Sequence, residues 1–208
     1  MNLYSYVVAR DYGFAPNPFY GTCTLATCKP VLRRMASVGD WVIGTGSAEN
    51  GLTGRLVYAM KVTEIISFED YFADERFQEK KPNLAGSLKQ AFGDNIYFRD
   101  RTGAWDQLDS HHSLQNGIPN PTNIRNDTDP DRLLLSDHFA YFGMNALEIP
   151  KEIRFHDGVD ICAQRHYRVN FKAEHAGQFV GWFEGLDVSG FEGKPYEWLK
   201  NGALRRRG

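Results

Sequence analysis

The three cysteines are the first residues whose chemistry can be judged from their spacing. Cys23 and Cys28 lie close together, while Cys162 lies far along the chain. A structural zinc site needs four ligands of the cysteine or histidine type. Neither a second cysteine pair nor a nearby histidine accompanies the first pair, so we expect no metal and no other cofactor. Cys23 lies in an aromatic-rich loop and is a candidate nucleophile, because a cysteine thiolate attacks electrophilic carbon atoms.

Two histidine motifs could supply a general base. The pair His111-His112 lies just beyond Asp109, and Asp137-His138 follows a serine. Histidine changes charge near neutral pH, so it can exchange protons with a substrate or hydrogen-bond the edge of a nucleobase. Such motifs are more often structural than catalytic. Asp137 and His138 border a predicted core strand and are therefore the preferred candidates for acid–base catalysis.

The familiar phosphate-binding and hydrolase motifs are missing from the chain. The sequence holds no Gly-Lys-Ser/Thr phosphate loop, no three-glycine dinucleotide fingerprint, no His-Glu-x-x-His and no Gly-x-Ser-x-Gly. These absences favour a binding protein over an enzyme without excluding an enzyme.

Length and charge limit the kinds of partner that the chain can bind. Its 208 residues suggest a single domain covering 1–208. The formal net charge is −2, so no strong field draws the protein onto a long nucleic acid or a membrane, whereas a pocket for one nucleotide needs no such field. Aromatic residues make up 13% of the chain, which favours strands and aromatic-lined pockets. We expect Arg205-Arg206-Arg207 to form a solvated tail.

Composition also predicts a compartment. An odd, low cysteine count fits a reducing environment. No signal peptide opens the chain, and no apolar run approaches the length that spans a membrane. We therefore expect a cytoplasmic protein that does not bind membranes. The sequence predicts no oligomeric state.

The long connection Asp11–Thr27 follows the first predicted strand, Tyr4–Arg10. It carries four aromatic residues, two glycines and two prolines. A loop of this length either stacks its aromatic faces on a planar ligand or packs them under the sheet as an Ω-loop. We favour the ligand, because the loop leaves a predicted central strand.

A glycine-rich strand exit follows in Val38–Ser47. Gly39-Asp40 forms a turn, Trp41–Ile43 an apolar strand, and the return strand covers 55–62. The glycines of the exit serve either the turn alone or the close approach of a ligand.

The remaining predicted elements are shorter. A helix covers Cys28–Ala36, and we expect Arg33 and Arg34 on it to be solvated or salt-bridged. A capping pattern begins a helix at Ser67. The other predictions are a hairpin of 95–99 and 103–108, strands over 139–142 and 167–171, and a helix over 177–184.

Together these segments resemble a known family. The order of strand, aromatic loop, short helix, Val-Gly-Asp strand and return strand resembles the PUA-like superfamily, which includes EVE, YTH and ASCH domains. More narrowly, the chain resembles the nucleotide modification associated domain 2 family over nearly its whole length. The segments that carry this resemblance are Tyr4–Arg10, Asn17–Tyr20, Cys23–Pro30, Gly39–Ser47 and Leu135–Gly143.

The resemblance implies both a fold and a pocket. The implied fold is α+β, a PUA-like bent mixed β-barrel flanked by short helices, with a loop-rich insertion around 83–131. EVE and YTH relatives hold a modified base in a pocket, often against aromatic rings. In this chain the pocket would lie between the first-strand loop and the exit of the Gly39 strand. The implied ligand-binding residues are Arg10, Asn17, Phe19, Tyr20, Thr45, Gly46 and Ser47. The exit has Gly-Thr-Gly-Ser where a cage aromatic often stands, so the cage aromatic would be Tyr12, Phe14, Tyr97 or Trp105.

We therefore expect binding of a modified nucleobase or nucleotide, free or within DNA or RNA, in nucleic-acid modification or phage defence. A base in duplex DNA would have to be flipped out of the stack. Two alternatives stay open. One is a nucleotide- or base-modifying enzyme that uses Asp137-His138 or Cys23, and the other is a protein that sequesters a free nucleotide signal.

Overall fold

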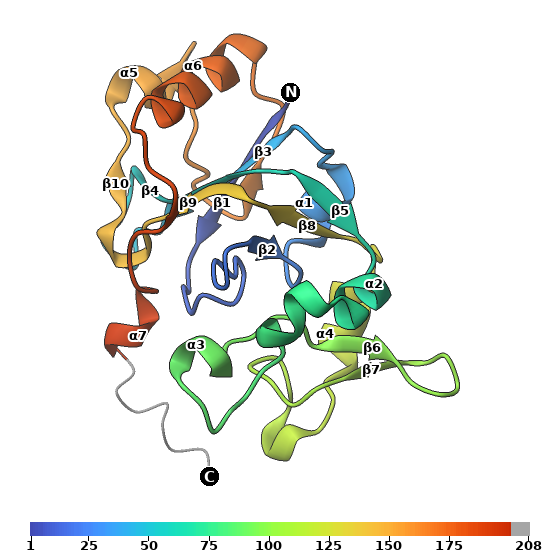
Figure 1. Ribbon diagram of the computed structural model, residues 1–208. Helices are drawn as coiled ribbons and strands as arrows, with labels where there is room; N and C mark the ends of the chain where they lie inside the picture. The colour runs from blue at the N-terminus through green and yellow to red at the C-terminus, as the bar shows by residue number, and fades with distance from the viewer. Residues whose placement is uncertain (201–208) are drawn as a thin grey trace. The chain divides into compact units, whose positions relative to one another are not determined.

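The strands of the computed structural model form several separate sheets joined by short helices (Figure 1). The structure describes residues 1–200, so the predicted tail Arg205–Arg207 lies outside the described residues. The mixed α/β class is confirmed. The expected barrel is not found in the described part of the chain, because the outermost strands of each sheet pair on one side only.

The described chain separates into two compact units, and each unit is built from several segments. The predicted insertion, 83–131, falls within the second unit. The first unit comprises Met1–Asp11, Ala36–Thr63 and the described part of Asp137–Gly208, and the second comprises Tyr12–Met35 and Glu64–Ser136.

The first unit is centred on β1 (Leu3–Val8), β3 (Trp41–Gly46) and β4 (Arg55–Lys61). β1 and β3 pair in parallel, and β3 and β4 pair antiparallel, which confirms the predicted return strand. Every residue of β3 is buried, as its nearly continuous apolar run predicts. The other elements of this unit are β9 (His138–Tyr141), η3 (Gly143–Asn145), β10 (Leu147–Glu148), α5 (Lys151–Arg154), β11 (Phe155–His156), β12 (Val159–Asp160), β13 (Tyr167–Arg168), α6 (Ala173–Glu184), β14 (Gly190–Phe191) and α7 (Glu197–Lys200).

Close packing explains why glycine stands in β3. The ring of Trp41 meets that of Phe183 on α6 with centroids 5.3 Å apart, within the main apolar core of the unit. A Cβ added at Gly44 would lie 2.4 Å from the ring of Tyr58, closer than real Cβ contacts. Gly44 is therefore required by packing inside the first unit.

The second unit combines the antiparallel sheet β2-β8-β5 with the hairpin β6-β7. The hairpin of β6 (Tyr97–Arg99) and β7 (Trp105–Gln107) was predicted and is confirmed. Helix α2 (Phe68–Ala73) begins where the capping pattern predicts, because the Ser67 side chain accepts the Asp70 backbone N–H. The other elements are β2 (Cys23–Leu25), α1 (Pro30–Met35), β5 (Glu64–Ile66), η1 (Glu75–Lys80), α3 (Leu88–Ala91), η2 (Gln115–Gly117), α4 (Pro121–Thr128) and β8 (Leu133–Ser136).

A buried polar cluster holds the long aromatic loop of the second unit. Lys80 Nζ donates to the backbone oxygen of Asn17 at 3.0 Å and to its Oδ1 at 2.7 Å. Asp94 accepts hydrogen bonds from the hydroxyls of Thr24, at 2.5 Å, and Tyr71, at 2.8 Å. Burial lowers the pKa of Lys80 to about 8, against the attraction of Asp94. Buried charges are costly unless polar partners satisfy them, so this cluster specifies one conformation of the loop around Asn17.

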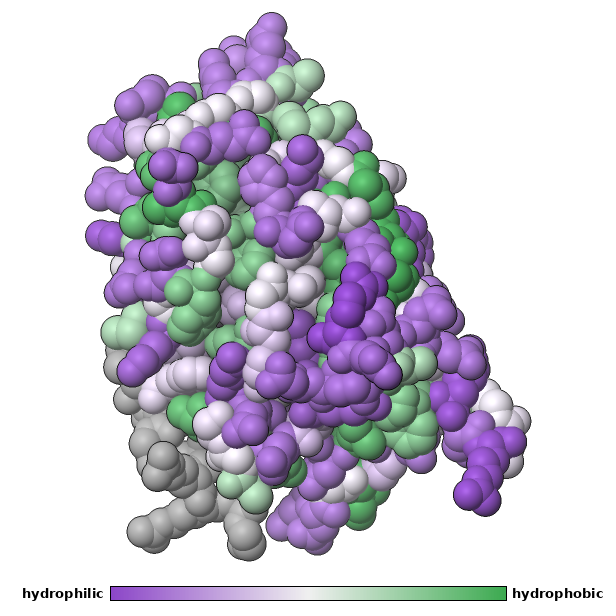
Figure 2. Space-filling view, viewed as in Figure 1, coloured by the Kyte–Doolittle hydropathy of each residue, from purple (hydrophilic) through white to green (hydrophobic). Residues whose placement is uncertain are grey.

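The surface of the protein is mainly polar on the face that Figure 2 shows, with smaller hydrophobic areas between the hydrophilic side chains. Within residues 1–200, no helix has both the length and the apolar character needed to cross a membrane.

Candidate active site

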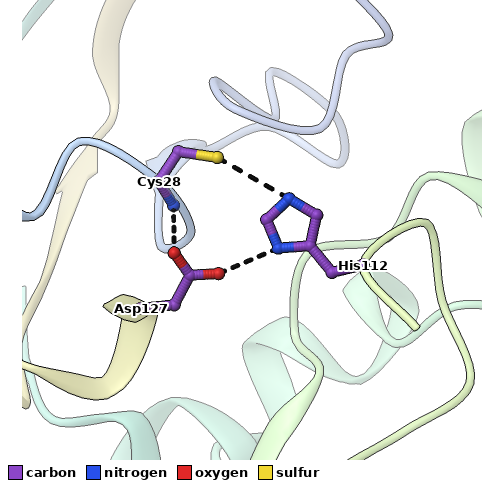
Figure 3. A group of neighbouring side chains, drawn as sticks. All are labelled: Cys28, His112 and Asp127. Carbon is purple, nitrogen blue, oxygen red and sulfur yellow. Dashed lines mark hydrogen bonds and ion pairs between the residues drawn. The ribbon is translucent and has the colours of Figure 1, made fainter. Parts of the chain in front are cut away.

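Three segments of the second unit bring Cys28, His112 and Asp127 together (Figure 3). Cys28 lies in the turn between β2 and α1, His112 in the loop that follows β7, and Asp127 near the end of α4. The Sγ atom of Cys28 lies 3.7 Å from Nε2 of His112. The other ring nitrogen, Nδ1, lies 2.9 Å from Oδ2 of Asp127. The imidazole therefore connects a thiol on one side to a carboxylate on the other.

The carboxylate of Asp127 is fixed on both of its oxygens. Oδ1 accepts the backbone N–H of Cys28 at 2.8 Å, and Oδ2 accepts the hydroxyl of Tyr97 at 2.7 Å. An ionised carboxylate only accepts hydrogen bonds, so Nδ1 of His112 must carry the hydrogen that faces it. This leaves Nε2 to exchange a proton with the thiol of Cys28.

Arg33 links the backbone at Cys28 to the backbone at Asp127. Its guanidinium is fully buried and donates to the carbonyl of Cys28 at 2.9 Å and to that of Asp127 at 2.5 Å. It also reaches the carbonyls of Pro130 and Arg132. The prediction that Arg33 is solvated or salt-bridged is wrong, because the side chain is buried and its donors bind backbone carbonyls. Arg34 does form a surface salt bridge, with Asp129.

The backbone at the thiol adopts a rare conformation. Cys28 has φ of 59° and Lys29 has φ of 45°, in the left-handed region that non-glycine residues seldom occupy. Such strain persists only where the surrounding structure imposes it, and it concentrates at functional sites. The hydrogen bonds of the Cys28 N–H and carbonyl, to Asp127 and Arg33, supply that constraint.

The environment of His112 favours its charged form. Burial opposes the charge, but hydrogen bonds to Asp127 and Cys28 outweigh burial and raise the pKa of His112 to about 9. The ring is therefore an imidazolium near neutral pH. An adjacent imidazolium favours the thiolate form of a cysteine, which is the reactive nucleophile.

The three cysteines differ sharply in their surroundings. Cys28 is partly exposed, whereas Cys23 and Cys162 are buried. Burial raises the pKa of both Cys23 and Cys162 to about 12. The predicted nucleophile, Cys23, thus lies where a thiolate is disfavoured, whereas Cys28 is partly exposed and contacts the imidazole of His112.

The same three side chains could also hold a metal ion, since their ligand atoms lie within 4.8 Å of one another. A single ion could reach Sγ of Cys28 and Nε2 of His112. Oδ2 of Asp127 is already hydrogen-bonded to Nδ1 of the same ring and to the hydroxyl of Tyr97. The arrangement is that of a nucleophile, its base and the group that orients the base. The hydrogen bonds among the three residues therefore fit nucleophilic chemistry better than metal binding.

Two aromatic rings of the long loop, those of Tyr12 and Phe14, pack against the histidine pair. The ring of Phe14 lies 4.6 Å from that of His112, and the ring of Tyr12 lies 4.5 Å from that of His111. Tyr12 also stacks on Phe92, with centroids 5.1 Å apart. Flat side chains therefore lie next to the ring that contacts the thiol.

Comparison with known proteins places the chain in a family. The family model described as nucleotide modification associated domain 2 matches residues 1–202. The chain belongs to this family. The narrower resemblance noted in the sequence, to this family, is thereby confirmed, and the family description associates its members with nucleotide modification. No curated protein and no solved structure matches the chain.

Several residues predicted to bind ligand in this family member lie in the second unit with the Cys28 site. Asn17 and Phe19 are buried, and Tyr20 lies under the Lys89 ammonium, 3.8 Å from its ring centroid. Tyr97 is buried and donates a hydrogen bond to Asp127. Trp105 is partly buried and lies under the guanidinium of Arg99. Their contact with a ligand stays a prediction.

The other predicted ligand-binding residues belong to the first unit. Arg10 is exposed, while the hydroxyl of Thr45 donates to the backbone oxygen of Tyr6 at 3.3 Å. A Cβ at Gly46 would lie 2.3 Å from Leu52, so packing explains this glycine. Ser47 Oγ accepts the backbone N–H of Asn50. A ligand-binding role for these four positions also stays a prediction.

The preferred acid–base pair of the sequence, Asp137 and His138, lies in the first unit. Both residues are exposed. The backbone N–H of Asp137 donates to the hydroxyl of Thr63, and the ring of His138 meets that of Trp41 edge to face at 5.3 Å. The structure thus places them in a different unit from the Cys28 site.

Sequence reasoning missed two of the three residues. Cys28 was interpreted as a helix-start residue and Asp127 as part of a loop, whereas His112 was considered as a base. Cys28 and His112 are 84 positions apart, and His112 and Asp127 are 15 apart. No local spacing reports such a grouping, so only the fold could reveal it.

Proposed function

We propose that this protein is an enzyme that modifies a nucleotide or nucleobase through a covalent bond to Cys28. The observation that carries the proposal is the geometry of Cys28, His112 and Asp127, with the imidazole between thiol and carboxylate. The family description supports a substrate of the nucleotide class. We thus prefer the alternative of a nucleotide- or base-modifying enzyme, with Cys28, His112 and Asp127 in place of Asp137-His138 or Cys23.

The chemistry follows from which proton each atom can hold. The thiolate of Cys28 attacks an electrophilic carbon of the substrate and forms a carbon–sulfur bond. The displaced electron pair moves onto a substrate atom or leaving group, which takes the Nε2 proton of His112. Neutral His112 then accepts a proton from the second nucleophile, which releases Cys28. Asp127 keeps the ring oriented through both steps. Proton transfer by a positioned group contributes a rate factor of about 10²–10⁴.

The aromatic rings beside the site suit a flat substrate. Stacking of a base on an aromatic side chain contributes about 1–3 kcal/mol. The rings of Tyr12 and His111 lie 4.5 Å apart, the ring of His111 lies 6.0 Å from that of His112, and His111 is exposed. We propose that they contact a modified base or nucleotide, free or within DNA or RNA.

A second candidate is retention of the nucleotide without turnover, either as recognition of a modified base or as sequestration of a signal. The aromatic rings around His111 and His112 favour it, since stacking alone needs no nucleophile. The mass of any small molecule that co-purifies with the protein separates the two candidates. A noncovalent, unchanged nucleotide supports retention, and an adduct on Cys28 supports the enzyme.

The decisive experiment incubates the protein with a panel of nucleotides and modified nucleotides. Chromatography measures turnover, and intact-protein mass spectrometry measures covalent adducts. We expect an adduct on Cys28 that is absent in Cys28→Ser and greatly reduced in His112→Ala. His138→Ala is the matched control, because it removes a histidine of the first unit. Adduct formation that survives in Cys28→Ser, or is lost equally in His138→Ala, would falsify the assignment.

The wider context is also a proposal. We propose a role in nucleic-acid modification or phage defence, in the reducing environment of the cytoplasm, and membership of the PUA-like superfamily. Three cysteines that form no disulfide support the reducing environment. Phage infection of cells carrying either wild-type protein or Cys28→Ser tests the role. Equal survival of the two would count against it.

A further inference from the structure

The hydroxyl of Tyr97 contacts both the carboxylate of Asp127 and the ring of His112. It donates to Oδ2 of Asp127 at 2.7 Å, and its oxygen lies 3.4 Å from Nδ1 of His112. The same Oδ2 atom faces Nδ1 of His112 at 2.9 Å. Two donors, one phenolic and one imidazole, therefore share a single carboxylate oxygen.

Tyr97 is held firmly enough for this contact to be specific. It is fully buried in β6, and its ring meets that of Phe68 edge to face at 5.6 Å. The carboxylate that it contacts is itself only 4% exposed, so water does not compete strongly for Oδ2. In such surroundings a hydrogen bond to a charged group is stronger than in water.

We propose that Tyr97 is a positioning residue that sets the acidity of His112 through Asp127. The inference rests on the proposed function for its purpose, but the interaction can be measured without a substrate. By donating to Oδ2, Tyr97 withdraws part of the negative charge that would otherwise hold the His112 proton. It thereby makes the imidazolium a better acid.

The charged and titratable groups that face His112 come from several elements. Cys28 lies in the turn before α1, Asp127 on α4 and Tyr97 on β6, while His111 is its neighbour in the same loop with rings 6.0 Å apart. The buried cation of Arg33, on α1, contacts the backbones of Cys28 and Asp127. The substitution Tyr97→Phe removes only the phenolic hydroxyl and keeps each of these groups in the chain.

The test is an NMR titration of the His112 ring nitrogens in wild type and Tyr97→Phe. We expect the titration midpoint of His112 to move to higher pH in Tyr97→Phe, because Oδ2 loses a competing donor. Tyr71→Phe is the matched control. It removes a buried hydroxyl of the same unit that donates to another buried carboxylate, Asp94, at 2.8 Å. We expect the His112 midpoint to stay unchanged in that variant.

A double-mutant comparison distinguishes an effect that passes through Asp127 from a general change in structure. In an Asp127→Asn background, Tyr97→Phe should no longer move the His112 midpoint, because the path through the carboxylate is gone. An unchanged midpoint in Tyr97→Phe, or an equal shift in Tyr71→Phe or in the Asp127→Asn background, overturns the inference. If Cys28 forms no adduct with any nucleotide but the midpoint shifts as expected, the proposed function fails while the assignment of Tyr97 stands.

Discussion

At the scale of single residues, the site depends on what the neighbours of each thiol and imidazole do to its charge. Cys23 and Cys28 are only five positions apart, yet one is sealed in the core and the other meets an imidazole. Cys23 faces the buried Lys80 and Asp94 cluster, where burial still raises its pKa to about 12. The identity of a residue is therefore a weaker guide to reactivity than the groups packed around it.

The pH dependence of stability should reveal the His112 interaction. The pKa of His112 is raised from 6.5 to about 9 in the folded protein. A raised pKa stabilises the folded state most below the unfolded value, so this contribution is full below about pH 6.5 and is lost as the pH rises through about 9. Urea unfolding of wild type and His112→Gln measures it. We expect the difference in the free energy of unfolding to shrink between about pH 6 and about pH 10.

Lys80 also makes the stability of the protein depend on pH, so the variant must be compared with the wild type. Its pKa is lowered to about 8, so its burial penalty falls as the pH rises above that value. This effect opposes that of His112 but is present in both proteins and cancels in their difference. A difference that stays constant across the pH range would show that His112 is not held as an imidazolium.

At the scale of elements, the short helix α1 (Pro30–Met35) matters because of one of its two arginines. Arg33 is buried and donates to four backbone carbonyls on two segments, while Arg34 reaches only Asp129 at the surface. The sequence does not predict which of these two adjacent arginines is buried, because both lie on the same short helix. The position of α1 against the segment after α4 decides it.

Substitution of each arginine by methionine tests this assignment. Arg33→Met removes the guanidinium donors from the carbonyls of Cys28, Asp127 and Arg132, and an unsatisfied buried group costs on the order of 1–3 kcal/mol, so we expect a loss of at least about 2–3 kcal/mol. Arg34→Met removes an exposed pair, with side chains 54% and 79% exposed, and should cost no more than about 1 kcal/mol. Chemical unfolding measures both. Similar losses of unfolding free energy in the two variants would contradict the assignment that Arg33 joins the two backbone segments.

Several elements were predictable because their signals are local. The pairing of β3 with β4, the hairpin β6-β7 and the Ser67 cap all follow from residues close together in the chain. Turn residues and caps act within a few positions, so their patterns survive in the sequence. The expected barrel did not appear in residues 1–200, because sheet closure depends on pairing between distant strands.

At the scale of the whole molecule, the net charge of −2 bears on the size of the partner. A protein that tracks a long phosphate backbone neutralises many phosphates, and each contributes about 0.9 to the salt slope of its affinity. We expect this protein to show only a shallow salt dependence with a long DNA duplex. Fluorescence anisotropy over a series of salt concentrations measures it, with a free nucleotide as comparison. A steep slope with the duplex would instead indicate a polymer substrate.

Membership of the family and the local elements were determined by the sequence itself. The resemblance to the family rests on short segments such as Asn17–Tyr20 and Gly39–Ser47, which can be recognised without the fold, and the family model matches residues 1–202. The grouping of Cys28, His112 and Asp127 was decided only by tertiary structure. A thiol, an imidazole and a carboxylate that lie far apart in the chain meet because α1, α4 and the loop after β7 pack together in the second unit. Long-range packing leaves no periodic trace in the sequence, and the reactive site depends on that packing.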